Sequence, residues 1–192
     1  VALCRVANFG ILCCNLWLSK NRRFDALCHF TFAIIGFVFD QILFVKENGL
    51  LMEANLISGA VFSDERGAVS FVNDFKFTDI ERFYILENSE KHPVRAWQGH
   101  KLDCKNFYCI AGAFQVSYVK VDNWESPSPS LKVGRVVLTA SKSAVLRIPA
   151  GYANAIKALE PGSRLMSFST LPLNQVKEDD VRFDKNKWNF DE

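Results

Sequence analysis

The sequence predicts an all-β fold, a sandwich or a barrel, for residues 52–192. About nine short runs rich in β-branched and aromatic residues follow one another there, and turn residues separate them at intervals of roughly 8–12 residues. Little of this region repeats with the period of an amphipathic helix. About 140 residues are enough to enclose one hydrophobic core. The region also lacks a strand–helix–strand nucleotide-binding pattern and a Gly-rich phosphate loop.

The first predicted strands come in pairs around polar turns. LISGAVF and AVSFVND flank the turn SDERG, which ends at Gly67. RFYILENS and VRAWQGH follow, and the dipeptide His92–Pro93 between them interrupts regular strand pairing. KNFYCIAGAFQVSYVKV then predicts a hairpin around AGA, with Phe114 and Val116 on one face of its second strand.

The remaining predicted strands follow a loop. NWESPSPS carries two prolines and three serines in residues 123–130, which is typical of a loop. GRVVLTA, SAVLRIPAGYANAIKAL and SRLMSFST come after it, and Pro149 with Gly151 predicts a sharp turn inside the second of these runs. After Thr170 the chain is polar, and LNQVKEDDVRFD predicts a short helix or an irregular tail.

Composition argues against several classes of function. The chain has 23 basic and 21 acidic residues, and residues 52–192 hold 18 of each, so no strong field favours nucleic acid or an anionic membrane as a partner. A first-row metal site needs three or four converging ligands, whereas this region offers two histidines, His92 and His100. Cys104 and Cys109 would face opposite sides of a strand, which argues against a disulfide or a zinc site. We therefore expect no metal and a reduced, cytoplasmic protein.

The stretch VRAWQGHK, residues 94–101, gathers polar side chains on one predicted strand. Residues two apart on a strand share a face, so Gln98 and His100 point to one side, whereas Arg95 and Trp97 point to the other unless a bulge turns them. The residues alone leave two interpretations open. His100 is a packed or surface histidine at a strand end, or Gln98 and His100 line a cavity whose rim Arg95 reaches.

Four stretches, in this order, resemble the cupin-type sugar-nucleotide isomerases, which include the dTDP-4-dehydrorhamnose 3,5-epimerases and the dTDP-sugar 3,4-ketoisomerases. FSDERG is similar to their early D-x-R-G turn, and VRAWQGHK is similar to the strand that reads R-G-x-H or R-G-x-H-x-H-K. KNFYCIAGAFQV resembles their next hairpin, and IPAGYANAI resembles their turn I-P-x-G-x-A-H. The tail DDVRFDKNKW is similar to their closing segment, so the resemblance covers residues 52–188.

This resemblance implies a double-stranded β-helix, the cupin jelly roll, that binds a nucleotide-diphospho-4-keto-6-deoxyhexose. Such enzymes need no metal or redox cofactor, because the ketone acidifies the neighbouring C–H bond and a base removes its proton to form an enolate. Reprotonation then gives an epimer or an isomer. The chemistry requires a base, an oxyanion stabiliser, an acid and cations for the diphosphate. The resemblance also implies a homodimer whose partner covers strand edges, acting in deoxysugar biosynthesis for surface polysaccharide.

The resemblance assigns roles residue by residue. His100 matches the second histidine of the ketoisomerase strand and would be the base, and Lys105 would stabilise the enolate. Arg66 would contact the diphosphate and Arg95 the sugar or its phosphate, because guanidinium groups suit such oxygens. The other expected contacts to the nucleotide sugar come from Gln98, Tyr108, Tyr118 and Asn154. For the two tyrosines, packing in the core is the alternative.

Three positions depart from the family pattern. Gln98 and Asn154 stand where the epimerases have histidines, and glutamine cannot act as a base. Leu173 or a neighbour stands where they have a late tyrosine, and the aspartate that partners their catalytic histidine corresponds to Asp184. Two functions therefore remain in view. The protein is an isomerase or epimerase with His100 as its base, or it is a non-catalytic cupin module that binds a sugar nucleotide or a glycan.

Residues 1–51 form an apolar segment that differs in composition from the rest. They hold seven of the 17 phenylalanines and four of the six cysteines, and the first methionine of the chain is Met52. Three interpretations compete: a translated region upstream of a natural start at Met52, a membrane segment, or extra helices packed on the domain. A membrane segment is costly because His29 and Asp40 would lie in hydrocarbon. We favour the first interpretation, which places this segment outside the domain.

A chain that begins at Met52 should therefore fold as stably as the full chain, because the barrel supplies its own core. Thermal unfolding of the two chains, followed by circular dichroism, measures the difference. Equal melting temperatures are expected. A marked fall in melting temperature or in solubility of the shorter chain would show that residues 1–51 are part of the folded unit.

Overall fold

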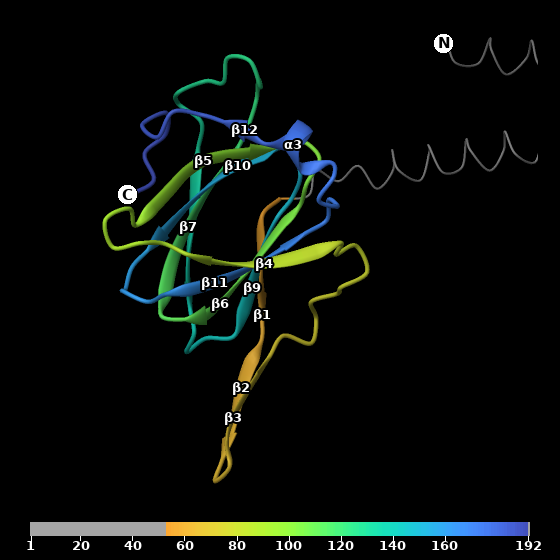
Figure 1. The fold of residues 1–192 in the computed structure, drawn as a ribbon, viewed down its shortest axis with the longest axis vertical. Coiled ribbons are helices and arrows are strands. Elements are labelled where there is room, and N and C mark those ends of the chain that lie inside the picture. The colour runs from red at the N-terminus through yellow and green to blue at the C-terminus, as the bar shows by residue number, and fades with distance from the viewer. Residues whose placement is uncertain (1–52, 192) are drawn as a thin grey trace, which may run out of the picture. The chain divides into compact units, whose positions relative to one another are not determined.

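The structure is a computed structural model that describes residues 53–191 (Figure 1). Residues 1–51 and the three interpretations given for them lie outside the described residues. The described part contains twelve strands and one short helix. These are β1 (Asn55–Ser58), β2 (Ala60–Asp64), β3 (Gly67–Phe71), β4 (Arg82–Glu87), β5 (Val94–His100), β6 (Lys105–Ala111), β7 (Ala113–Lys120), β8 (Val133–Thr139), β9 (Ala144–Ile148), β10 (Tyr152–Ala158), β11 (Arg164–Ser169), α3 (Val176–Asp179) and β12 (Val181–Arg182). Within residues 53–191, no helix has the length and apolar character that crossing a membrane requires.

The strands form two five-stranded sheets and a separate hairpin (Figure 1). The first sheet has the order β1-β9-β6-β11-β4, the second has the order β12-β5-β10-β7-β8, and β2 pairs with β3. The pairs between named strands are antiparallel. From β4 onward the chain alternates between the two sheets except at the β7–β8 connection. This arrangement confirms the predicted all-β jelly roll.

One predicted strand is divided in two at Gly59. The Gly59 N–H donates to the carbonyl oxygen of Ser143 at 2.8 Å, and a Cβ at position 59 would lie 1.9 Å from the carbonyl oxygen of Phe71. Only glycine permits this close approach of two backbones. The chain therefore leaves the first sheet at the end of β1, and the β2–β3 hairpin extends away from the barrel (Figure 1).

The interior between the sheets has an apolar side and a polar side. Phe114, Val116 and Leu146, from β7 and β9, are 0 % exposed and belong to the central apolar cluster. The strand register places a second, polar group of side chains on the inner faces of β4, β5, β6, β10 and β11: Tyr84, Gln98, His100, Lys105, Asn154, Ser167 and Ser169. Apolar packing closes one part of the barrel, and hydrogen-bonding groups line the rest.

The C-terminal tail covers the outer face of the second sheet. Trp97 and Trp188 are 0 % and 2 % exposed and pack edge to face with ring centroids 5.3 Å apart. The Trp97 indole N–H donates to the carbonyl oxygen of Trp188 at 3.1 Å, and the Trp188 indole N–H donates to that of Ser128 at 2.9 Å. A buried tryptophan of this kind typically contributes about 3–5 kcal/mol relative to alanine. The tail therefore holds Trp97 outward, which leaves its neighbour Gln98 to face the interior.

The outer face of the first sheet and the hairpin expose apolar side chains. Phe62 and Val69 on the hairpin are 58 % and 62 % exposed, and Phe83 on β4 is 64 % exposed. A groove of about 280 Å³ lies on the same face of the sheet. Its aromatic lining consists of Phe71, Phe75, Phe77, Tyr108 and Phe168. Apolar side chains that stay exposed together in this way mark a surface for association with another molecule.

Candidate functional site

Strand β5 presents its polar side chains to the barrel interior. Gln98 stands opposite Asn154 and His100 stands opposite Tyr152 in the register with β10. The register then shifts: the step of two residues on β10 from Asn154 to Ile156 is matched by a step of three residues on β5 from Gln98 to Arg95. This bulge gives Arg95 the same face as Gln98, as the sequence had suggested.

Arg95 lies at the exposed end of β5 and is held by the preceding loop. Its Nε donates to the Asn88 side-chain oxygen at 2.8 Å, and one terminal nitrogen donates to the carbonyl oxygen of Glu87 at 3.5 Å. Asn88 is itself buried and donates to the carbonyl oxygen of Pro93 at 2.7 Å. The guanidinium is therefore positioned by backbone and amide groups, with no carboxylate among these partners, and its positive charge remains available to an anion.

His100 forms a buried pair with Asp179. His100 is 7 % exposed and Asp179 is 2 % exposed, and His100 Nδ1 lies 3.5 Å from Asp179 Oδ2. Asp179 also accepts the backbone N–H groups of Lys101 and Leu102 at 2.8 Å each and that of Asp103 at 3.0 Å. Facing a carboxylate, Nδ1 is the nitrogen that keeps the proton, and Nε2 is then free to accept one.

The aspartate beside His100 is Asp179, whereas the family resemblance matched Asp184 to the aspartate that partners the family's catalytic histidine. Asp184 is exposed, and its carboxylate accepts the backbone N–H of Asn186 at 2.8 Å in a local turn. The helix α3 ends at Asp179 and β12 then pairs with β5, so the chain brings the earlier aspartate to the histidine. Residues 178–180 are all acidic, so the sequence alone could not show that Asp179 would be the one beside His100.

Lys105 forms a second buried pair, with Asp103. Lys105 is 3 % exposed, and its ammonium donates to Asp103 Oδ2 at 2.6 Å. The Ser169 hydroxyl donates to the same oxygen at 2.6 Å, and the backbone N–H groups of Thr170 and Leu171 donate to Oδ1 at 2.9 and 3.1 Å. Burial disfavours the charged carboxylate, but the bonds from Lys105 and Ser169 outweigh it and hold the pKa of Asp103 below its ordinary value.

The environment of His100 favours its neutral form. Burial is the largest cause that lowers the pKa of His100, and the positive charge of Lys105 lowers it further. The carboxylates of Asp103, Asp179 and Asp180 act in the opposite direction without cancelling these effects. His100 is therefore unprotonated at neutral pH, which is the state that a general base requires.

Three of these residues also form the group of potential metal ligands found within residues 53–191. His100, Asp103 and Asp179 each place one ligand atom within 4.8 Å of the others. However, both carboxylates already accept hydrogen bonds on both oxygens, and Asp103 is paired with the Lys105 ammonium. A cation would have to displace these donors. The two carboxylates are therefore engaged in a hydrogen-bonded network, which fits the arrangement better than a metal site.

Two further polar residues lie beside Gln98. Asn154 on β10 is 2 % exposed, and its amide nitrogen donates to the backbone oxygen of Gln98 at 3.3 Å. Arg182 on β12 stands opposite Gln98 in register. Sequence reasoning had not selected Arg182, Asp103 or Asp179. Asp103 had a usable signal, because it lies two residues before Lys105 and so shares its side of the chain.

The structure places three other predicted residues away from this network. Tyr108 lies on the outer face of the first sheet, in the aromatic groove. Arg66 lies at the tip of the β2–β3 hairpin with 83 % of its side chain exposed, and pairs with Asp64 of the same turn. Leu173 is 74 % exposed in the loop after β11. Ser167 and Ser169 occupy inner positions of β11, and the Ser167 hydroxyl is fully buried without a hydrogen-bond partner among the described residues.

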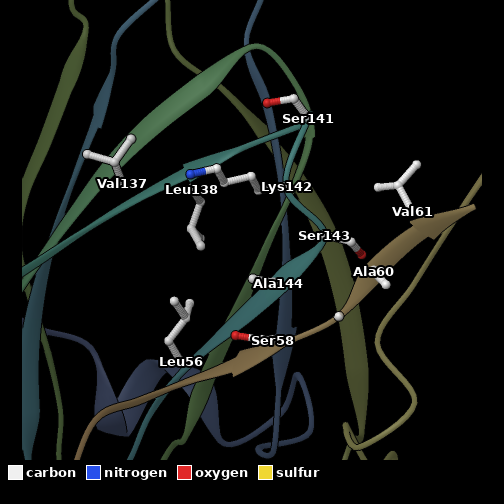
Figure 2. Close-up of a pocket in the computed structure, with 11 residues that line it drawn as sticks. Leu56, Ser58, Ala60, Val61, Val137, Leu138, Ser141, Lys142, Ser143 and Ala144 are labelled. Carbon is white, nitrogen blue, oxygen red and sulfur yellow. The ribbon is translucent and has the colours of Figure 1, made fainter.

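Tyr118 does face the interior, at its apolar side. Its ring lies 6.3 Å from that of Tyr152, and the two rings line a hollow of about 280 Å³ with Lys120 and Lys132. A different hollow, of about 380 Å³, lies where β1 and β2 meet the β8–β9 turn (Figure 2). Its lining includes none of the predicted site residues.

Comparison with known proteins agrees with this architecture. No protein-family model and no curated protein sequence matches the chain. Among solved structures, the rmlC epimerase of Mycobacterium tuberculosis superposes with a TM-score of 0.57 at 18 % identity, covering 68 % of each chain. A dTDP sugar isomerase from Desulfovibrio desulfuricans gives a TM-score of 0.55 at 22 % identity, covering 69 % of this chain and 85 % of the other.

A third similar structure contains a ligand. It is a variant of the sugar 3,4-ketoisomerase QdtA of Thermoanaerobacterium thermosaccharolyticum in complex with TDP-4-keto-6-deoxyglucose. The TM-score is 0.53 at 17 % identity, covering 70 % of this chain and 90 % of the other. At these identities the comparisons establish a shared cupin jelly-roll fold, and the function must be argued from the site.

Replacing Asp179 by asparagine should lower the pKa of His100 further, because the carboxylate of Asp179 raises it. The variant should also lose about 1–3 kcal/mol of stability, since three buried backbone N–H groups lose a charged acceptor. Histidine proton resonances followed against pH measure the first effect, and urea unfolding measures the second. Asp180→Asn is the matched control, because Asp180 is exposed and its effect on His100 is smaller. An equal or larger effect of Asp180→Asn would contradict the pairing of His100 with Asp179.

Proposed function

We propose that residues 52–192 form a sugar-nucleotide isomerase or epimerase that acts on a nucleotide-diphospho-4-keto-6-deoxyhexose by removing a proton next to the ketone. The observation that carries this proposal is the arrangement of two buried pairs, His100–Asp179 and Lys105–Asp103, on either side of one short loop. One pair supplies a neutral base, and the other supplies a fixed positive charge. The shared fold with the epimerase and the ketoisomerases supports the same class of substrate.

The reaction uses these groups in sequence. His100 Nε2 takes the proton from the carbon next to the ketone, and the electron pair of that C–H bond forms the enolate. The Lys105 ammonium, fixed by Asp103 at 2.6 Å, stabilises the negative charge on the enolate oxygen. The proton of the hydroxyl group on that carbon passes to the former ketone oxygen, and the protonated His100 delivers its proton to the former ketone carbon, so that ketone and hydroxyl exchange places. The step needs no oxidant or reductant, because the substrate and product differ only in where the hydrogen lies.

Binding of the nucleotide follows from the charges at the rim. The Arg95 guanidinium lies on the same face as Gln98 and suits a phosphate oxygen. Tyr118 offers a ring at the apolar side of the interior. In this proposal the sugar lies between β5 and β10, and the diphosphate extends toward Arg95.

A second candidate function is binding of the same ligand without catalysis. Gln98 and Asn154 are amides, which bind hydroxyl and carbonyl groups but cannot act as bases. Both face the interior in register with each other. A non-catalytic module that binds a sugar nucleotide or a glycan would use them in this way. Turnover by His100 is what separates the two functions.

His100→Ala should abolish exchange of solvent deuterium into the carbon next to the ketone, while affinity for the nucleotide sugar falls by less than about tenfold, or roughly 1.4 kcal/mol. Mass spectrometry of a panel of dTDP- and UDP-linked 4-keto sugars in heavy water measures the exchange. The wild-type rate should be flat above pH 7 and fall in acid, because the pKa of His100 lies below its ordinary value of about 6.5. His92→Ala is the matched control, since His92 is exposed in a turn outside the strands.

Two outcomes would change the assignment. Exchange that survives His100→Ala would place the base elsewhere in the protein. Tight binding of a nucleotide sugar by the wild type without any exchange would favour the binding module.

We further propose that the protein is a homodimer that works in the cytosol, with Arg66 completing the site of the partner. The Arg66 side chain cannot line the barrel interior of its own chain from the tip of a hairpin that extends away from it (Figure 1). The hairpin and the adjacent face of the first sheet expose Phe62, Val69 and Phe83, and a second copy would cover them. Free Cys104 and Cys109 support a reducing compartment.

Sedimentation should give a two-fold dimer at micromolar concentration for residues 52–192. Phe62→Asp should shift the protein toward monomer, because a charge on the hairpin opposes burial of its apolar face. Arg66→Ala should keep the dimer but weaken nucleotide-sugar binding more than it slows turnover. Lys142→Ala, an exposed basic residue outside the hairpin, is the control. A wild-type monomer would overturn this assembly.

A further inference from the structure

Arg182 fixes which end of the Gln98 carboxamide faces the barrel interior. The two residues stand opposite each other in the antiparallel β12–β5 pair and so share a face. A guanidinium carries only hydrogen-bond donors, whereas a carboxamide carries one acceptor oxygen and one donor NH2 group. With its oxygen toward Arg182, Gln98 accepts from one terminal nitrogen at 2.9 Å and from the other as well. The reverse orientation would set donors against donors.

With the oxygen bonded to Arg182, the NH2 group of Gln98 is the end of the carboxamide that points away from the guanidinium. The Arg182 guanidinium is held in turn by Asp180, whose carboxylate accepts from it at 2.7 Å. Its charge is thus partly neutralised, and its donors are directed at Gln98 and Asp180. Such an arginine suits the orientation of a neighbour better than the capture of a phosphate.

Asn154 presents the opposite group beside it. Its amide nitrogen donates to the backbone oxygen of Gln98 at 3.3 Å, which leaves its side-chain oxygen as an acceptor. Directly opposed residues of an antiparallel pair have Cβ atoms about 4.5–5.5 Å apart. The interior therefore offers a donor from Gln98 and an acceptor from Asn154 side by side. A ligand that bonds to both the Gln98 donor and the Asn154 acceptor has a carbonyl oxygen on one carbon and a hydroxyl group on the adjacent carbon.

We propose that Arg182 is a positioning residue that makes Gln98 a hydrogen-bond donor to a ketone oxygen, while Asn154 accepts from the neighbouring hydroxyl. The site thereby selects an α-hydroxy ketone, the group that a 4-keto sugar with a free 3-hydroxyl presents. This inference rests on the proposed function, because it takes the nucleotide sugar as the ligand. It adds a residue and a basis for selectivity that the catalytic pairs do not supply.

The test compares three ligands by calorimetry in a His100→Ala background, which removes the proposed base. The ligands are TDP, TDP-6-deoxyglucose with a hydroxyl at carbon 4, and TDP-4-keto-6-deoxyglucose. Arg182→Ala should weaken binding of the keto sugar by about tenfold relative to TDP. Gln98→Ala should cause a similar loss, and the double variant should lose no more than either single variant, because both act through one contact. Arg164→Ala, which removes an arginine paired with Glu87 on the first sheet, should change none of the three affinities.

A ligand-free measurement separates orientation from general stability. The side-chain amide resonances of Gln98, assigned with labelled glutamine, should shift in Arg182→Ala and not in Arg164→Ala. Thermal unfolding of Arg182→Ala should match the parent, since 61 % of this side chain is exposed.

The remaining outcomes overturn the inference in distinguishable ways. Equal weakening of all three ligands by Arg182→Ala would make Arg182 a phosphate contact. Additive losses in the double variant would mean that Arg182 and Gln98 act separately. Unchanged binding of the keto sugar would remove any role for Arg182, with the proposed function intact. Absence of binding by every TDP ligand would remove the proposed function itself, and this inference with it.

Discussion

Two buried carboxylates organise the candidate site. Asp179 accepts hydrogen bonds from backbone N–H groups of the loop that joins β5 to β6, and Asp103 accepts them from the two residues that follow Ser169 at the end of β11. Each carboxylate also holds one ionisable side chain. A buried carboxylate without such donors would cost several kcal/mol, so the loop, the helix α3 and the end of β11 must close around them together. The positions of His100 and Lys105 follow from this closure. The chemistry of the site therefore depends on groups that do not themselves touch a substrate.

The two faces of the second sheet differ in what they contribute. The outer face contributes stability, and the inner face carries polar side chains of the candidate site. On the outer face the tail packs Trp188 against Trp97 and buries both. On the inner face the same strand, β5, carries Gln98 and His100, whose side chains do not take part in this tryptophan packing. A polar interior can be tolerated in a small barrel because apolar packing is supplied on the far side of the sheet and around Phe114 and Leu146.

The fold and the central residues of the candidate site could be predicted from the sequence, whereas the positions of the residues around them could not. The alternation on VRAWQGHK predicted that Gln98 and His100 share a face, and the family resemblance implied that this face is the inner one. Only Arg95 required a bulge to join it. Tyr108 was assigned to the interior together with Lys105, but it lies three residues further along the same strand, so the two side chains point to opposite faces. Arg66 was matched by motif, but only the break at Gly59 reveals that its hairpin leaves the barrel. Asp179 was hidden among like-charged neighbours.

The contacts of Asp103 and Asp179 also bear on how the protein is made. Asp179 bonds to residues 76–78 positions earlier in the chain, and Asp103 bonds to residues 66–68 positions later. Contacts between such distant segments form late and slow the folding of antiparallel β proteins. During synthesis β5 is made long before α3, so almost the whole chain must be made before Asp179 can pair with His100. A ribosome-bound or truncated chain would thus contain His100 without its buried aspartate, and the pair could form only after both β5 and α3 have been made.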